Sequence, residues 1–248
     1  MRMNVKQAFS NGKSVLPFLT CGYPDLETTE QVAYALERAG VGLIVLGIPF
    51  SDPTGEGPTL RQASECALEN GVTTERVFDL VARIRRNCSM PLAFMTYANV
   101  VFSYGTVRFL EQAAKLGVGA IILPDVPFEE KEEFAAVCRQ VGVQYISLVA
   151  PTSEERLGKI AREAQGFICF VSPCGAREID TLRQFTLLPV VACGGGESCP
   201  GQLAKEAAAA DGIFVDSAIM DVVARHGKDA PQAVFDYAKS IVAAVRQD

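Results

Sequence analysis

The residues best suited to chemistry lie in one loop, within the stretch LIVLGIPFSDPTGEGP from Leu43 to Pro58. Asp52 and Glu56 follow an apolar run directly, in a segment rich in Gly and Pro. Two carboxylates at the mouth of an apolar pocket can divide acid and base work, because burial raises the pKa of one while the other stays ionised. An Asp beside a Pro also commonly shapes a turn, so the loop alone leaves a structural role open.

Composition argues against other catalytic centres. His226 is the only histidine and lies in a charged segment near the C-terminus, which disfavours a Ser-His-Asp or Cys-His centre. The eight cysteines include no CxxC pair, so we expect no metal site. In a chain of this length without an export signal, reduced thiols are expected rather than disulfides.

Charge and hydropathy bear on partners and location. The formal net charge of −6 disfavours nucleic acid, which requires concentrated Lys and Arg. The one basic cluster, RIRR at residues 83–86, is predicted to be a solvated helix C-terminus. No apolar run approaches the ~18 residues of a membrane span, and the start lacks the apolar core of a signal peptide. We therefore expect a cytoplasmic protein that binds neither nucleic acid nor membrane.

A repeating pattern indicates the fold. An amphipathic helix, a Gly-containing turn and a short apolar run recur in ALERAGVGLIVLG, EQAAKLGVGAIILPD, AVCRQVGVQYISLVA, AREAQGFICFVS and AKEAAAADGIFVDS. The glycines suit helix C-caps, and continuous apolar runs are typical of parallel strands covered on both faces. With SVLPFLTC, PLAFMTYAN and LPVVACGGG this makes eight strands. Eight βα units predict an α/β fold, a single-domain TIM (β/α)8 barrel over residues 1–248. A doubly wound sheet is disfavoured, because no GxGxxG follows the first strand.

In a TIM barrel the site forms at the C-terminal ends of the strands. The predicted strand-end residues are apolar with a few polar groups, as expected of a pocket for a small, largely hydrophobic ligand. They are Phe18, Thr20 and Cys21; Val45 and Leu46; Thr96, Tyr97 and Asn99; Pro124 and Asp125; Ala150 and Pro151; Cys169 and Ser172; residues 193–196; and Asp216 and Ser217.

Four motifs, in order, carry a family resemblance over essentially the whole chain: GIPFSDPTGEGP, MTYANVVFSYG, PDVPFEE and VAPTSEERL. They resemble the tryptophan synthase α-subunit family. The resemblance implies a TIM barrel that splits indole-3-glycerol phosphate into indole and glyceraldehyde 3-phosphate. It implies no cofactor in this subunit and a pyridoxal-phosphate β subunit as partner. Such a reaction needs an acid to protonate the indole ring, a carboxylate for the indole N–H and a base for the glycerol hydroxyl.

Several positions depart from that family. Glu56 matches the loop Asp that accepts the indole N–H, but is one methylene longer. Val45 occupies the position of the catalytic Glu on the second strand, so the implied proton donor is missing. Cys169 corresponds to a pocket Tyr, and the lid after the sixth strand is reduced to SPCGAREI.

The resemblance also assigns binding residues. Gly195, Gly196 and Ser217 match a phosphate cradle, while Asp216 replaces a Gly there. A like charge at ~4–5 Å in a partly desolvated site would weaken phosphate binding by about 1–4 kcal/mol. Other pocket residues are Phe18, Tyr97, Asn99 and Cys169. The residues expected to contact the β subunit are Pro49, Asp52, Pro53, Asp125 and Pro127.

Three functional hypotheses follow from these departures. The first is a degenerate α subunit retained as the activating partner of a β subunit, with impaired or no lyase activity. The second is a divergent lyase acting on a different, indole-like or unphosphorylated substrate through Glu56. The third is an ordinary lyase in which another group replaces the Glu missing at position 45. Cys21, Cys169 and Cys193 are expected to be small buried residues rather than reactive thiols.

Overall fold

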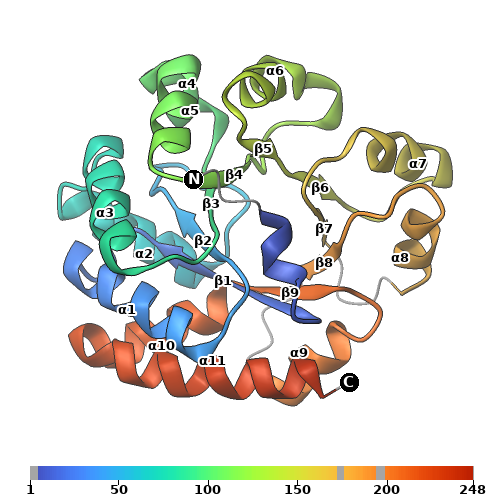
Figure 1. Cartoon of the computed structure of the whole chain (residues 1–248). Coiled ribbons are helices and arrows are strands. Elements are labelled where there is room, and N and C mark those ends of the chain that lie inside the picture. Colours follow the sequence, from blue (N-terminus) through green and yellow to red (C-terminus); the bar gives the residue numbers. More distant parts are fainter. Residues whose placement is uncertain (1–4, 172–175, 194–198, 248) are drawn as a thin grey trace.

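A computed structural model describes residues 5–171, 176–193 and 199–247 of the chain. Its strands form one parallel sheet in the order β5-β4-β3-β2-β1-β9-β8-β7-β6. The two edge strands are separated in the chain by Ile146 alone, so the sheet curls into a barrel whose fifth position is one interrupted strand (Figure 1). The predicted single-domain TIM barrel is confirmed.

The strands are short and apolar, as the sequence pattern indicates. They span Ser14–Thr20 (β1), Ile44–Gly47 (β2), Leu92–Met95 (β3), Val118–Ile122 (β4), Gln144–Tyr145 (β5), Ser147–Val149 (β6), Ile168–Val171 (β7), Val190–Cys193 (β8) and Gly212–Val215 (β9). Strands β1, β2, β4 and β9 are buried along their whole length. Burial on both faces is the reason that the alternating pattern of a half-exposed sheet is missing.

Helices surround the sheet (Figure 1). The α-helices are Leu26–Ala39 (α1), Pro58–Glu69 (α2), Thr74–Asn87 (α3), Ala98–Tyr104 (α4), Thr106–Lys115 (α5), Glu132–Val141 (α6), Glu154–Glu163 (α7), Ala176–Arg183 (α8), Pro200–Glu206 (α9), Ser217–His226 (α10) and Ala230–Arg246 (α11). Short 3-10 helices span Val5–Phe9 (η1), Phe128–Glu130 (η2) and Gly227–Asp229 (η3). Gly40 and Gly142 end α1 and α6 in the left-handed conformation, as predicted for C-caps. In the described part of the chain, no helix combines the length and hydropathy needed to cross a membrane.

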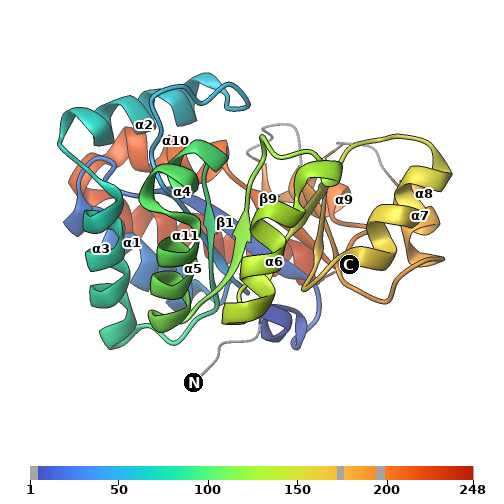
Figure 2. The same ribbon diagram turned by 90° about the horizontal axis from the view of Figure 1, so that it is seen from above.

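The two ends of the barrel differ. Figure 2 shows α2 and the loop before it at one end and η1, in dark blue, at the other. In η1, Val5 and Ala8 are buried, and the ring of Phe9 lies 5.7 Å from that of Phe167. The N-terminal end of the barrel is therefore covered by the chain itself, which leaves the opposite end for a ligand.

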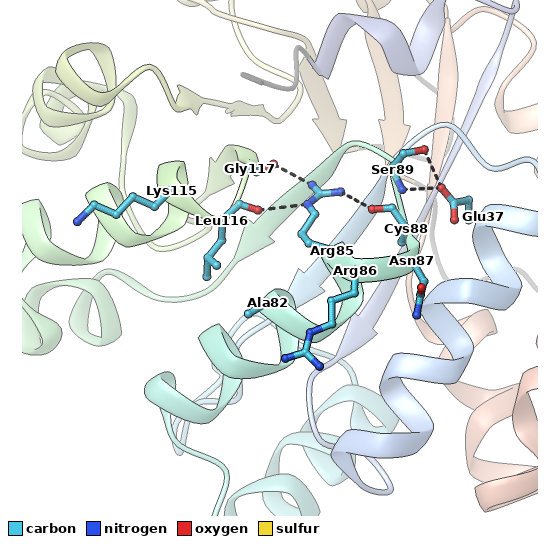
Figure 3. A pocket seen from close by; sticks show the side chains of 10 residues that line it. All are labelled: Glu37, Ala82, Arg85, Arg86, Asn87, Cys88, Ser89, Lys115, Leu116 and Gly117. Atoms are coloured by element: carbon cyan, nitrogen blue, oxygen red, sulfur yellow. Dashed lines mark hydrogen bonds between the residues drawn. The ribbon is translucent and has the colours of Figure 1, made fainter.

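A cavity of about 670 Å³ between the ends of α3 and α5 is organised by Arg85 (Figure 3). Its guanidinium donates to the carbonyls of Leu116 (3.2 Å) and Gly117 (2.8 Å), and also to that of Met90. Burial lowers the pKa of Arg85. The sequence predicted a solvated helix terminus here. Arg86 is exposed as expected, but Arg85 is half-buried and joins three elements, because its guanidinium donates to backbone carbonyls of each.

Candidate functional site

The loop between β2 and α2 is built from two tight turns. The N–H of Thr54 donates to the carbonyl of Asp52 at 2.9 Å, and the N–H of Glu56 donates to that of Pro53 at 3.2 Å. Pro58 then occupies the first turn of α2, where its missing N–H costs no hydrogen bond. These turns place Asp52 in solvent and hold Glu56 half-buried.

Glu56 is the most perturbed carboxylate of the barrel mouth. Burial raises its pKa to about 7; the Tyr97 hydroxyl opposes the shift and the charge of Asp216 adds to it. Its Oε2 atom is buried and has no hydrogen-bond partner among the described residues. A carboxyl group with a pKa near 7 can both hold and release a proton at neutral pH, which is the requirement for acid-base work.

Tyr97 supports the loop from the neighbouring strand. It follows β3 and is buried, and its hydroxyl oxygen accepts a long hydrogen bond of 3.4 Å from the N–H of Gly55. Its ring stacks on Phe50, with centroids 5.0 Å apart. Burial, together with the charge of Glu56, raises the pKa of Tyr97 to about 12, so it remains a neutral hydroxyl. Tyr97 thereby fixes the position of Glu56 relative to β3.

Val45 lies on β2, just before this loop, and belongs to the hydrophobic core. Its side chain is 0% exposed, and in the sheet Val45 is paired with Phe18 on β1 and Ala93 on β3. The Phe18 ring covers Gly47 so closely that a Cβ there would lie 2.2 Å from it. The ring of Phe18 also lies 6.2 Å from that of Phe214. The structure thus places an aliphatic side chain in a tightly packed layer of the barrel interior.

Asp216 lies at the end of β9 and begins α10. Its Oδ1 accepts a hydrogen bond of 2.6 Å from the N–H of Ser217. Contact with the Cys169 thiol, burial and the charge of Asp216 all raise the pKa of Cys193. The charge of Asp216 therefore acts on both Glu56 and Cys193, which come from different elements.

Cys21 and Cys193, two of the cysteines at the mouth, are protonated thiols at neutral pH because their pKa values are raised. Cys21 and Cys169 are buried, and burial raises the pKa of Cys21. Cys193 is only partly buried, but its pKa is also raised. Thiolates are the reactive form of cysteine, so these thiols suit packing better than nucleophilic chemistry, as the sequence predicts. Among the described residues, no group of three or more His, Cys, Asp or Glu side chains is arranged to hold a metal ion.

The five residues expected to contact the β subunit differ in exposure. Asp52, Asp125 and Pro127 are exposed, whereas Pro49 and Pro53 are buried within the chain. Both carboxylate oxygens of Asp125 accept the N–H of Ala98, at 3.0 and 3.1 Å, so this residue caps α4 from another loop.

Asn99 does not join Glu56 at the mouth. It is exposed, accepts a hydrogen bond of 3.4 Å from the Ser103 hydroxyl, and lines a groove of about 370 Å³ with Pro49 and Phe50. Gly195, Gly196 and the first half of the predicted lid, residues 172–175, lie outside the described residues.

A cleft that the sequence did not reveal lies beside Glu56. It has a volume of about 720 Å³ and is lined by residues of the loops after β2, β4 and β6 together with α7 and the end of β7: Gly55, residues 124–128, residues 148–152, Arg156, Ile160 and Val171. Val171 is 46% exposed there. The Pro residues of PDVP and VAP were a sequence signal for rigid loops, but the convergence of these loops follows only from the closure of the barrel.

The comparisons with known proteins agree on one family. The family model described as tryptophan synthase alpha chain matches residues 5–246. A tryptophan synthase alpha chain from Lacticaseibacillus casei is 37% identical over 96% of this chain and 93% of its own length. One from Geotalea uraniireducens is 41% identical over 86% of this chain and 84% of its own.

Solved structures extend the similarity to the fold. The tryptophan synthase alpha chain of Legionella pneumophila superimposes with a TM-score of 0.90, at 29% identity over 99% of this chain and 98% of its own. A chain of the tryptophan synthase complex from Pyrococcus furiosus has a TM-score of 0.86, at 30% identity over 94% of this chain and 99% of its own.

Proposed function

Because the chain belongs to the tryptophan synthase alpha chain family, we propose that it is an α subunit with impaired or no lyase activity that binds and activates a β subunit. The observation that carries this proposal is the fully buried, apolar position of Val45. The family resemblance assigns the proton-donating Glu to that position. Loss of a positioned acid-base group typically lowers a rate by about 10²–10⁴-fold.

Glu56 retains one of the two carboxylate roles that the family resemblance implies, the acceptance of the indole N–H. Its pKa of about 7 and its unpaired Oε2 suit it to accept an indole N–H. The resemblance assigns protonation of the ring to a separate acid at position 45, and the Val45 side chain has no proton to donate. With Glu56 alone, the site has a group to bind the indole N–H but lacks the acid that the complete retro-aldol reaction needs.

The proposed partner surface is the rim of the mouth. It consists of exposed Asp52, Asp125 and Pro127 with the neighbouring cleft. A similar structure from P. furiosus is described in terms of mutual activation of the tryptophan synthase α2β2 complex. By analogy, the rim here would contact a pyridoxal-phosphate β subunit, while buried Pro49 and Pro53 shape the loop from inside. This role is consistent with a cytoplasmic protein that carries reduced cysteines.

The test is a single-turnover incubation with indole-3-glycerol phosphate, following indole, with and without the β subunit of the same source. We expect no substantial indole release, but faster condensation of serine with indole by the β subunit when the α subunit is added. Rapid indole release by the α subunit would refute impaired lyase activity. Absence of any effect on the β subunit would refute the activating role.

A second candidate is a divergent lyase acting on a different indole-like or unphosphorylated substrate. Glu56, with its raised pKa, favours it. Glu56→Gln separates the two: activation of the β subunit survives this change if the chain is an activating partner, whereas turnover of a new substrate is lost if Glu56 does chemistry. A third, an ordinary lyase with a substitute acid, requires an ionisable group in the Val45 layer, where Phe18 and Ala93 are its sheet partners.

A further inference from the structure

A small pocket lies between α6 and α7, which are neighbours on the outside of the barrel, beside the strand that Ile146 interrupts (Figure 1). It has a volume of about 190 Å³ and shares no lining residue with the cleft beside Glu56. At about 30 Å³ per water molecule, it has room for roughly six waters or for an organic molecule of similar size. The pocket is therefore separate from the barrel mouth and large enough for a small ligand.

Lys131 is the buried charge of this pocket. Only 7% of its side chain is exposed. Its Nζ donates to Oε2 of Glu163 at 2.8 Å and lies 3.6 Å from the centre of the Phe128 ring. An ammonium group has three N–H donors, and these two contacts engage two of them. One donor of a buried cation thus has no acceptor among the described residues.

Two buried hydroxyl groups line the same pocket. Tyr145 and Ser147 are each 6% exposed, and neither hydroxyl makes a hydrogen bond in the part of the chain that the structure describes. Burial raises the pKa of Tyr145, so its hydroxyl stays protonated and can donate. Buried polar groups in folded proteins nearly always have a partner. A molecule in the pocket would supply one.

The acids of the pocket do not use these donors. Glu132 pairs with Arg139, with 2.6 Å between Oε2 and NH2, and Glu163 pairs with Lys131. Both carboxylates are more than half exposed, so water screens their charge, whereas the charge of Lys131 is buried. The pocket therefore presents hydrogen-bond donors and a positive charge to its contents.

We propose that this pocket is a binding site for a small hydroxycarboxylate. The carboxylate accepts a hydrogen bond from Nζ of Lys131, and the remaining oxygens bond to the hydroxyls of Tyr145 and Ser147. The site lies outside the barrel sheet and uses none of the residues of the mouth or the rim. The inference therefore stands independently of the proposed function.

The test compares two probes of equal size that differ in charge, lactate and lactamide. NMR titration of the protein at fixed ionic strength measures both affinities. We expect wild type to bind lactate at least about tenfold more tightly than lactamide, because a charge-assisted hydrogen bond contributes about that factor. Equal affinities, or no binding of lactate, would leave the pocket to water and overturn the proposal.

A matched pair of lysine variants locates the site. Lys131→Met keeps the apolar stem without the charge and should abolish the preference for lactate. Lys159→Met makes the same change on the other lysine that faces Phe128, with Nζ 5.6 Å from the ring centre, at a residue that does not line the pocket. It should leave both affinities unchanged. Equal losses in the two variants would reduce the effect to net charge and refute the site.

Two milder variants decide the question if Lys131→Met does not fold. Ser147→Ala removes a hydroxyl that has no partner among the described residues, and should weaken lactate binding roughly threefold or more. Glu163→Gln removes the charge that competes for Lys131 and should tighten lactate binding by about the same factor. If neither variant changes the affinity for lactate, Lys131 serves only to pair with Glu163 and the proposal is wrong.

Discussion

At the scale of single residues, the raised pKa of Glu56 makes the free energy of unfolding depend on pH. Its pKa is raised from 4.5 to about 7 in the folded chain. Between these values the folded state binds more protons than the unfolded state, so the contribution of this group to stability is full below pH 4.5 and is lost as pH rises through 7. Allowing for the partial exposure of the side chain, the loss should be roughly 1–2 kcal/mol.

Glu56→Gln should therefore flatten the dependence of unfolding free energy on pH between 4.5 and 7. Denaturant titrations at several pH values measure it, and Asp52→Asn, an exposed acid of the same loop, is the matched control. Equal slopes in wild type and Glu56→Gln would show that Glu56 has no raised pKa in solution.

Substitutions at Val45 measure how much stability is lost when a carboxylate is placed in the barrel interior. Val45→Glu places an ionisable group at a fully buried position of the hydrophobic core, so we expect a loss of about 2–4 kcal/mol in stability, larger at pH 8 than at pH 5. Val45→Gln has the same size without the charge and should lack the pH dependence. If Val45→Glu retains wild-type stability at both pH values, the position is more polar than its packing indicates.

At the scale of elements, Arg85 joins α3 to the ends of α5 and β3 through backbone carbonyls. Arg85→Met keeps the apolar stem but removes the donor from these part-buried carbonyls, which should cost about 1–3 kcal/mol. Arg86→Met, in the next and exposed position of the same helix, should change stability by less than about 0.5 kcal/mol. Urea unfolding of both variants measures the difference; equal midpoints would contradict the structural role of Arg85.

The elements themselves were largely predictable, whereas contacts between them were not. Apolar runs and Gly caps, such as Gly40 and Gly142, are local signals and gave the strands and helix ends of the barrel. In the RIRR cluster, Arg85 bonds to carbonyls at the end of α5, whereas Arg86 is exposed. Because α5 comes later in the chain, the sequence alone does not show which of the two arginines makes these bonds. In the same way, Asp125 was placed in the correct loop, but its capping of α4 is a contact across the barrel rim.

The same limit applies to the site. Its composition followed from the rule that strand ends converge, which placed Tyr97, Cys169 and Asp216 at one end of the barrel. The burial and the charged neighbours of each side chain could not be predicted from the sequence, because they depend on residues that are distant in the chain. The raised pKa of Glu56 and the separate groove lined by Asn99 both depend on contacts between residues far apart in the sequence.

At the scale of the whole molecule, the two ends of the barrel have different tasks. The buried residues of η1 cover the N-terminal end, whereas the rim around the cleft at the other end retains exposed apolar surface, including Val171. If this rim docks a β subunit, Val171→Glu should weaken the complex at least about tenfold, because burying an unpaired carboxylate at an interface costs more than one factor of ten. Leu187→Glu is the matched control: Leu187 is fully exposed in the segment before β8, at the opposite end, and should leave affinity unchanged. Titration of the β subunit with each variant, following its condensation rate, gives the affinities. Equal weakening by both variants, or by neither, would place the partner surface elsewhere on the barrel.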